Sequence, residues 1–198
     1  PNLVFNLDFE SNTSTTTTDS VSSLVGVVEL CTDANGPWEV NDAKFGYSGD
    51  FRNPKDQGGT DDTSSRISLP PDLIWDLGYD ANTVRTFALW FGYHDGAGTF
   101  IGQANVYEEY ANAYWWQFRL RDGRIAVQMR YDSTNALFMR TAKNIYQLGI
   151  TFDDWYHVAA VIDRRTRYGS KIYLNGAPVE VEIVYHNYGP AFVDPTLE

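Results

Sequence analysis

Apolar and polar residues alternate along much of this chain, and a period of two is the pattern of β-strands. The alternation is clearest within residues 153–177, in runs at residues 157–162 and 171–174 that a charged turn separates. Asn175 and Gly176 follow the second run, and such a pair is typical of tight hairpin turns. We therefore expect these two runs to form a hairpin.

A second hairpin is predicted at residues 114–131, because Asp122 and Gly123 are a strong signal for a two-residue type I′ turn. The turn fixes which residues face each other across the two strands. The large apolar side chains then fall on one face, which we expect to lie in the core. They pair as Tyr114 with Tyr131, Trp116 with Met129, Phe118 with Val127, and Leu120 with Ile125.

The other face of this hairpin is the candidate binding surface. It carries Arg121 with Arg124, Arg119 with Ala126, Gln117 with Gln128, and Trp115 with Arg130, the last pair placed for a cation–π contact. Guanidinium and amide groups bind carboxylates and hydroxyls, and an indole ring stacks on a sugar. The ligand-binding residues expected are Trp115, Gln117, Arg119, Gln128 and Arg130. The alternative is a solvated or loop-covered sheet exterior whose arginines pair with nearby acids.

The remaining pattern adds strands and almost no helix. Alternation predicts a first strand around residues 3–8, and the Ser/Thr-rich residues 11–20 are expected to form a loop. Further strands are expected at residues 24–31 and 66–69, with a long excursion at residues 46–65. A further strand is predicted from Thr86 on, and one of its faces carries Phe87, Leu89, Phe91 and Tyr93. The fold class is therefore all-β.

Composition limits the size and the partners of the molecule. The 198 residues are 43% hydrophobic and 15% aromatic, which suits a single domain over residues 1–198. A net charge of -11 argues against nucleic acid as the main partner. No apolar run reaches the length of a membrane span, and residues 1–10 lack the pattern of a signal peptide, so we expect no membrane insertion. Cys31 stands alone and is expected to fill space in the core.

The order of Trp155, His157-Val158-Ala159, Asp163 and Ile172 to Gly176 resembles the signature of laminin-G-like, concanavalin A-like jelly-roll domains. The resemblance is strongest over residues 66–177. It implies an antiparallel β-sandwich that binds glycans or proteins more readily than it catalyses a reaction. Such domains usually end in a further strand after this hairpin that pairs with the first strand. Residues 179–185 are one candidate for it; a longer native chain or a neighbouring subunit would also complete the edge.

The same resemblance implies calcium near the loop rim, and acidic loops supply oxygen ligands of the kind that Ca²⁺ prefers. The expected metal ligands are Asp61 and Asp62 in one loop and Asp153 and Asp154 in another. No EF-hand spacing is present, and the three histidines lack zinc-site spacing.

Enzymes share this sandwich, and two sets of residues bear on catalysis. Glu180 and Glu182 share one face of a predicted strand, as the carboxylates of a retaining glycosidase do. Alternating Glu and Val suits a charged edge strand better. Gln117, Arg119, Gln128, Arg130 and Tyr131 resemble a polysaccharide lyase set, but Tyr131 falls on the core side. No catalytic residue is therefore assigned.

The sequence favours a non-catalytic glycan-binding or adhesion module that recognises glycans, acidic ones included, through the polar sheet face or the loop rim. The alternative is a structural or host-attachment protein of a virus or phage particle, which would form a homo-oligomer or a larger assembly. An extracellular or virion-surface location is expected in both cases.

Overall fold

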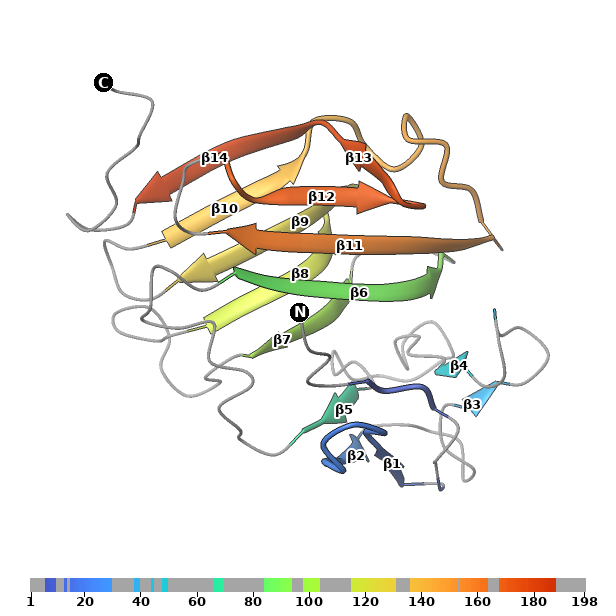
Figure 1. Ribbon diagram of the computed structural model, residues 1–198. Coiled ribbons are helices and arrows are strands. Elements are labelled where there is room, and N and C mark those ends of the chain that lie inside the picture. Colours follow the sequence, from blue (N-terminus) through green and yellow to red (C-terminus); the bar gives the residue numbers. More distant parts are fainter. Residues whose placement is uncertain are drawn as a thin grey trace, which may run out of the picture. The chain divides into compact units, whose positions relative to one another are not determined.

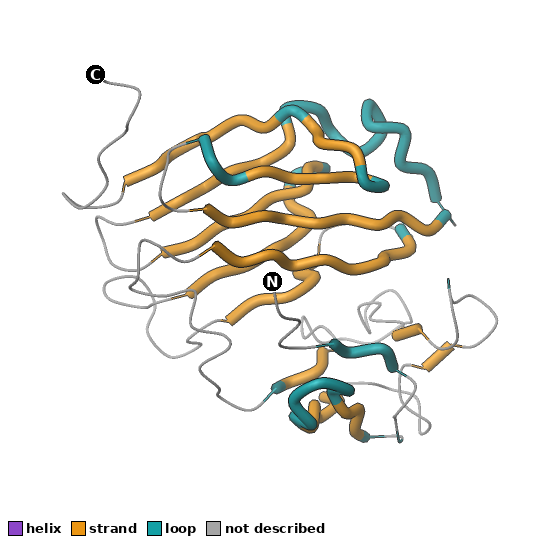
Figure 2. The backbone as a smooth tube through the Cα atoms, in the orientation of Figure 1, coloured by secondary structure: helices purple, strands orange, loops and turns teal. Residues whose placement is uncertain are grey.

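A computed structural model describes residues 6–9, 13, 15–29, 38–39, 44, 48–49, 66–69, 84–93, 98–103, 115–130, 136–152, 154–163 and 168–187. None of these residues lies in a helix (Figures 1 and 2). Their strands are β1 (Thr16–Thr18), β2 (Val25–Glu29), β3 (Trp38–Glu39), β4 (Ser48–Gly49), β5 (Arg66–Ser68), β6 (Val84–Gly92), β7 (Gly98–Gln103), β8 (Trp115–Arg121), β9 (Arg124–Arg130), β10 (Ala136–Thr141), β11 (Trp155–Asp163), β12 (Lys171–Leu174), β13 (Ala177–Val179) and β14 (Val181–Asn187).

The chain divides into two compact units, an N-terminal unit (Pro1–Asp76) and a C-terminal unit (Leu77–Glu198). The expectation of one domain over residues 1–198 stays a prediction.

The N-terminal unit contains an antiparallel sheet of order β1-β2-β5 and the two-stranded pair β3-β4. The strands predicted within residues 24–31 and 66–69 are confirmed as β2 and β5. The loop predicted at residues 11–20 is wrong for β1, which pairs with β2 from Thr16 to Thr18. Threonine is β-branched and suits a strand, and Thr17 is fully buried. The first strand predicted around residues 3–8 lies partly outside the described residues, and Asn6 to Asp8 are not in a strand.

Asp19 follows β1 and organises the loop that leads to β2. Its almost fully buried carboxylate accepts hydrogen bonds from the backbone N–H groups of Asn6, Val21 and Ser22 and from the Ser22 hydroxyl. Burial would raise the pKa of Asp19, but the hydrogen bonds from Ser22, Asn6 and Val21 outweigh it and lower that pKa below its ordinary value. The carboxylate therefore joins Asn6 to the loop at residues 20–24.

This arrangement predicts how the N-terminal unit responds to acid. Because the folded pKa of Asp19 is lowered, its contribution to stability is present above the unfolded pKa and is lost as the pH falls through the folded value. In an NMR titration, the Asp19 carboxyl carbon should titrate with a pKa below the ordinary aspartate value of 3.8. The amide signal of Ser22 should move with it. A midpoint for Asp19 at or above 3.8 would contradict this assignment.

The C-terminal unit is a sandwich of two antiparallel sheets, drawn as two layers in Figure 1. One sheet has five strands in the order β14-β10-β9-β8-β7, and the other has four in the order β13-β12-β11-β6. The chain passes between the sheets after β6, after β10 and after β13. At the last crossing only Glu180 separates β13 from β14.

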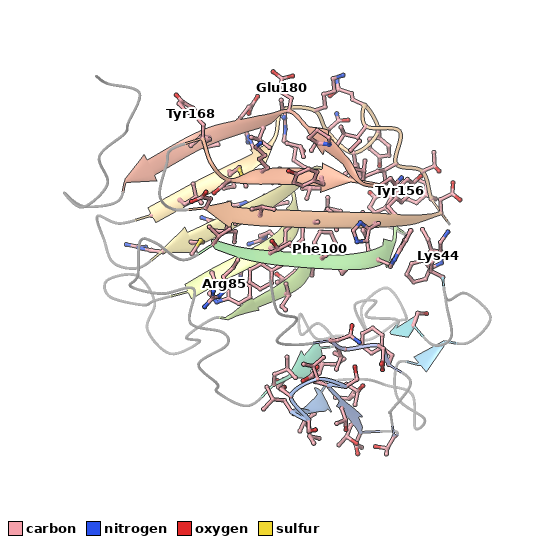
Figure 3. All side chains as sticks on the ribbon, in the orientation of Figure 1. Lys44, Arg85, Phe100, Tyr156, Tyr168 and Glu180 are labelled. Carbon is pink, nitrogen blue, oxygen red and sulfur yellow. The ribbon has the colours of Figure 1, made fainter. Side chains whose placement is uncertain are left out.

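Aromatic side chains join the two sheets. Phe87 of β6 stacks on Trp116 of β8, with ring centroids 4.6 Å apart, and Phe91 of β6 lies 4.9 Å from Phe100 of β7. Phe100 also meets Phe118 edge-on and so lies between the layers (Figure 3). All six predicted core residues with described side chains are buried: Trp116, Phe118, Leu120, Ile125, Val127 and Met129. Tyr114 and Tyr131 lie outside the described residues.

Two turns fix the registers of the hairpins. Asp122 and Gly123 both have positive φ, 52° and 67°, as a type I′ turn requires, and the predicted β8–β9 register is confirmed from Trp115–Arg130 to Arg121–Arg124. Asn175 and Gly176, with φ of 49° and 81°, form the same kind of turn between β12 and β13. The predicted pairing of the runs at residues 157–162 and 171–174 is confirmed as β11 with β12.

The all-β sandwich predicted from the sequence is confirmed in the C-terminal unit. The face shared by Phe87, Leu89, Phe91 and Tyr93 is confirmed as the inner one, since Phe91 and Tyr93 are buried. Residues 181–187 form a strand after the hairpin, and β14 pairs with β10 at the edge of the five-stranded sheet. The expected pairing of this strand with the first strand stays a prediction. The jelly-roll connectivity and the laminin-G resemblance stay predictions.

Candidate ligand-binding face

Arginine and glutamine side chains line the outer face of the five-stranded sheet, and we call this surface the arginine face. It follows from strand alternation: the inner residues of β8 and β9 are apolar, so their neighbours point outward. β10 adds Phe138 and Arg140, because Phe138 pairs with Gln128 and Arg140 with Ala126. The face consists of Gln117, Arg119, Arg121, Arg124, Ala126, Gln128, Arg130, Phe138 and Arg140.

Ala126 at the centre of the face is buried, with only 1% of its surface exposed, although it points away from the core. It is paired with Arg119 on one side and with Arg140 on the other. Long arginine side chains cover neighbouring surface with their methylene groups and keep the charged group outside. A small residue between two arginines therefore gives a closed apolar floor with guanidinium groups above it.

Two hydrogen bonds between arginine and glutamine order these side chains. Arg119 donates from Nη1 to Oε1 of Gln117 at 2.7 Å, and Arg121 donates from Nη1 to Oε1 of Gln128 at 3.1 Å. The guanidinium carbon of Arg121 also lies 5.8 Å from the centre of the Phe138 ring, within cation–π range. Arg121 thus reaches from the turn to the middle of the face.

Arg119 carries a charge that its surroundings compensate poorly. Its Nε–H is buried and has no hydrogen-bond partner among the described residues. Burial and then the nearby charge of Arg121 lower the pKa of Arg119, and Asp122 opposes them with a smaller effect. The guanidinium remains charged at any physiological pH. An anion that approached Arg119 and Arg121 would offset both the burial and the repulsion.

The sequence left open whether the arginines pair with acids, and some of them do. Arg140 Nε lies 3.0 Å from Glu182, and Arg124 lies 3.9 Å from the same carboxylate. Arg124 also donates to the carbonyl oxygens of Thr141 and Ala142, and Arg121 pairs with Asp122 of the turn at 3.4 Å. Among the described ion pairs, Arg140 and Arg124 share the Glu182 carboxylate, and Arg121 is paired with Asp122.

The structure brings four of the five predicted ligand-binding residues onto the face. Gln117, Arg119 and Arg130 are half-buried. Gln128 differs from the expectation of an open polar face, because it is only 9% exposed and accepts the bond from Arg121. The Trp115 backbone pairs with Arg130, but its side chain lies outside the described residues, so its cation–π contact stays a prediction.

Three residues of this region were missed from the sequence: Phe138 and Arg140, which belong to the face, and Glu182 beside it. They reach it because β10 pairs with β9 and β14 pairs with β10. Residues 136–139 form a short apolar run, Ala-Leu-Phe-Met, which is consistent with a strand, but apolar and polar residues do not alternate there. Glu182 is bonded to Arg140 at an edge strand, which agrees with the charged-edge interpretation of Glu180 and Glu182.

A second feature is a group of aromatic rings at one end of the C-terminal unit. Phe152 stacks on Tyr93 with ring centroids 5.1 Å apart, and Tyr146 meets Tyr93 edge-on at 6.4 Å. Tyr146 and Phe152 are 60% and 50% exposed. Thr151, next to Phe152, donates a hydrogen bond to Asp154 at 3.0 Å. We call Tyr93, Tyr146 and Phe152 the aromatic rim.

Asp154 is the one predicted metal ligand among the described residues; Asp61, Asp62 and Asp153 lie outside them. The described residues contain no group of three or more histidine, cysteine or acidic side chains placed to hold a metal ion. The calcium expectation therefore stays a prediction.

Calcium is tested by thermal unfolding. If Asp61, Asp62, Asp153 and Asp154 bind Ca²⁺ in the folded state, millimolar Ca²⁺ should raise Tm by mass action, and Mg²⁺ should raise it less. The shift should disappear in Asp154→Asn if that loop holds the ion. If calorimetry finds equal Tm with Ca²⁺ and with EDTA, the hypothesis of a Ca²⁺ site is wrong.

No protein-family model matches this chain, and neither a curated protein nor a solved structure is significantly similar to it. The described part of the chain contains no long apolar helix of the kind that crosses a membrane.

Proposed function

We propose that this chain is a non-catalytic binding module for anionic polysaccharides, and that the arginine face is its binding surface. The observation that carries the proposal is the concentration of five arginines on one sheet face of a chain whose net charge is -11. A basic surface on an acidic molecule attracts anions locally while the rest of the surface repels them. Glycan binding of this kind also agrees with the resemblance to laminin-G-like domains.

The chemistry of the face favours carboxylate or sulfate groups on a sugar chain. A guanidinium group binds an oxyanion through two parallel N–H donors, and Arg119 and Arg121 lie two residues apart on one strand. The half-buried Gln117 amide beside Arg119 suits sugar hydroxyls. Phe138 adds an aromatic ring to the same surface, and Trp115 is the further stacking residue that the sequence predicts.

The direct test is calorimetry with polygalacturonate, a carboxylate polymer, and with dextran as a neutral control. The proposal requires binding of polygalacturonate that weakens as sodium chloride is raised, because salt screens charges on an exposed face. Dextran should not compete. Binding of both polymers with no salt dependence would overturn the proposal.

The alternative is a structural or host-attachment protein of a virus or phage particle. It predicts that a neighbouring subunit covers the arginine face in a stable symmetric assembly. A salt-sensitive complex with polygalacturonate would argue against such a cover, because the face would have to be open in the purified protein.

A further inference from the structure

One row of paired residues crosses all five strands of the sheet that carries the arginine face. It runs from Thr99 of β7 through Arg119, Ala126 and Arg140 to Glu182 of β14. Arg119 and Arg140 therefore flank the same buried alanine, one on each side of it. Their places about β9 are equivalent, but the residues beyond them in the row differ in charge.

The guanidinium groups of these two arginines have different partners. Arg140 Nε donates to a carboxylate oxygen of Glu182 at 3.0 Å. Arg119 donates instead to the neutral amide oxygen of Gln117 at 2.7 Å, and Thr99 beyond it is exposed and uncharged. A carboxylate offsets the charge of a guanidinium group, whereas a neutral acceptor leaves that charge largely uncompensated. Of the two, Arg119 is therefore the better site for an external anion.

Glu182 also lies close to Arg124. Its second carboxylate oxygen is 3.9 Å from Arg124 Nη1, and the same guanidinium group donates to the backbone carbonyls of Thr141 and Ala142. The side chains of Arg124, Arg140 and Glu182 are 24%, 32% and 44% exposed, so a ligand on the face would reach this cluster. An anion bound there would have to displace the Glu182 carboxylate or bear its repulsion.

The carboxylate that pairs with Arg121 is placed differently. Asp122 lies in the turn beyond the end of β8, and its side chain is 74% exposed, so water screens its pairing with Arg121 at 3.4 Å. Glu182, by contrast, lies within a row of the sheet and beside two arginines. The side of the arginine face that carries Arg119 and Arg121 is therefore the more attractive one for an anion.

We propose that Glu182 is an internal counter-ion, which confines the anionic groups of the ligand to the Arg119 and Arg121 side of the arginine face. Its carboxylate competes with a bound anion for Arg140 and Arg124. The inference rests on the proposed binding of anionic polysaccharides and makes Glu182 a specificity-determining residue of that site. A polymer dense enough in charge to place anions on both sides of the face at once meets repulsion from Glu182.

Replacing Glu182 by glutamine tests the inference. The amide keeps the size and the acceptor oxygen of the side chain but removes its charge, so Arg140 and Arg124 become available to the ligand. The affinity for polygalacturonate at low salt should rise about three- to tenfold. It should also fall more steeply with added salt, because more charged contacts form. Glu182→Thr, a residue type that suits a strand, should show the same gain.

Two controls separate local competition from a general change in charge. Glu180 is an exposed carboxylate directly before β14, so Glu180→Gln changes the net charge equally. It should raise the affinity much less than Glu182→Gln does. Arg140→Gln should change the affinity of the wild-type chain little, but in the Glu182→Gln chain it should remove most of the gain.

The NMR signal of the Arg140 Nε–H group reports the same competition directly. Polygalacturonate should shift it less than the Arg119 signal in the wild-type chain, and the two signals should shift alike in Glu182→Gln. If the wild-type chain binds the polymer and Glu182→Gln binds it no better than Glu180→Gln does, the role of Glu182 is wrong and the proposed function stands. If neither the wild-type chain nor Glu182→Gln binds the polymer, both are wrong.

Discussion

Replacing Arg119 and Arg121 together by glutamine is expected to lower the affinity for polygalacturonate by about a hundredfold or more. A hydrogen bond to a charged group contributes about 1.5–3 kcal/mol, and each 1.4 kcal/mol is about tenfold in affinity. Arg119 donates to the neutral amide of Gln117 and Arg121 to that of Gln128, and the ion pair of Arg121 with Asp122 is solvent-exposed and contributes little. Titration calorimetry at low salt measures the effect, and circular dichroism checks the fold.

The matched control removes two positive charges from the other sheet. Arg85 and Lys171 are exposed on β6 and β12, and replacing both by glutamine changes the net charge equally (Figure 3 labels Arg85). If the arginine face binds the polymer, this variant should keep nearly wild-type affinity. Equal losses in the two double variants would mean that net charge, and not this face, determines binding.

Replacing Gly123 by valine is expected to destabilise the C-terminal unit by about 1–3 kcal/mol. Gly123 has a φ of 67°, a conformation that a β-branched residue resists, whereas a Cβ atom there would meet nothing closer than Asn144 at 4.0 Å. The cost is therefore backbone strain and not a steric clash. Urea unfolding followed by tryptophan fluorescence measures it.

Asparagine at position 123 is the control for this interpretation. Asn175 already holds a φ of 49° in the other hairpin turn, where its side chain accepts a hydrogen bond from the His157 N–H at 2.9 Å. Gly123→Asn should therefore cost much less than Gly123→Val. If both variants are equally destabilised, the space around the turn matters more than its backbone conformation. Since this turn also sets Arg121 opposite Arg124, Gly123→Val should weaken anion binding as well.

Local signals in the sequence predicted much of the C-terminal sandwich. Asp122-Gly123 determines a turn type, a turn type determines a register, and a register determines which side chains share a face. For this reason Phe118 and Val127 were placed in the core and Gln117 and Arg119 outside it. The same reasoning failed for Thr16 to Thr18, because a Ser/Thr-rich segment suits a loop and a strand alike until a partner strand is known.

The order of the strands within the sheet could not be predicted from the sequence. Nothing in residues 136–141 shows that Arg140 lies beside Ala126, or that Glu182 bonds to Arg140, since these contacts depend on the pairing of β10 with β9 and β14. The burial of Gln128 has the same origin: Phe138 lies beside it on β10, and Arg121 reaches it from β8. The site was therefore predicted as a list of side chains on one hairpin, and the neighbouring strands decide which of them are accessible.

The most direct measurement of the central claim is an NMR titration of the arginine Nε–H signals with polygalacturonate. If the arginine face binds the polymer, the signals of Arg119 and Arg121 should shift together and saturate, while the signal of Arg85 on the other sheet stays in place. The same titration at high salt should give smaller shifts at equal polymer concentration. Unchanged Arg119 and Arg121 signals, with shifts instead at Tyr146 and Phe152 of the aromatic rim, would contradict the account and move the binding site to the end of the sandwich.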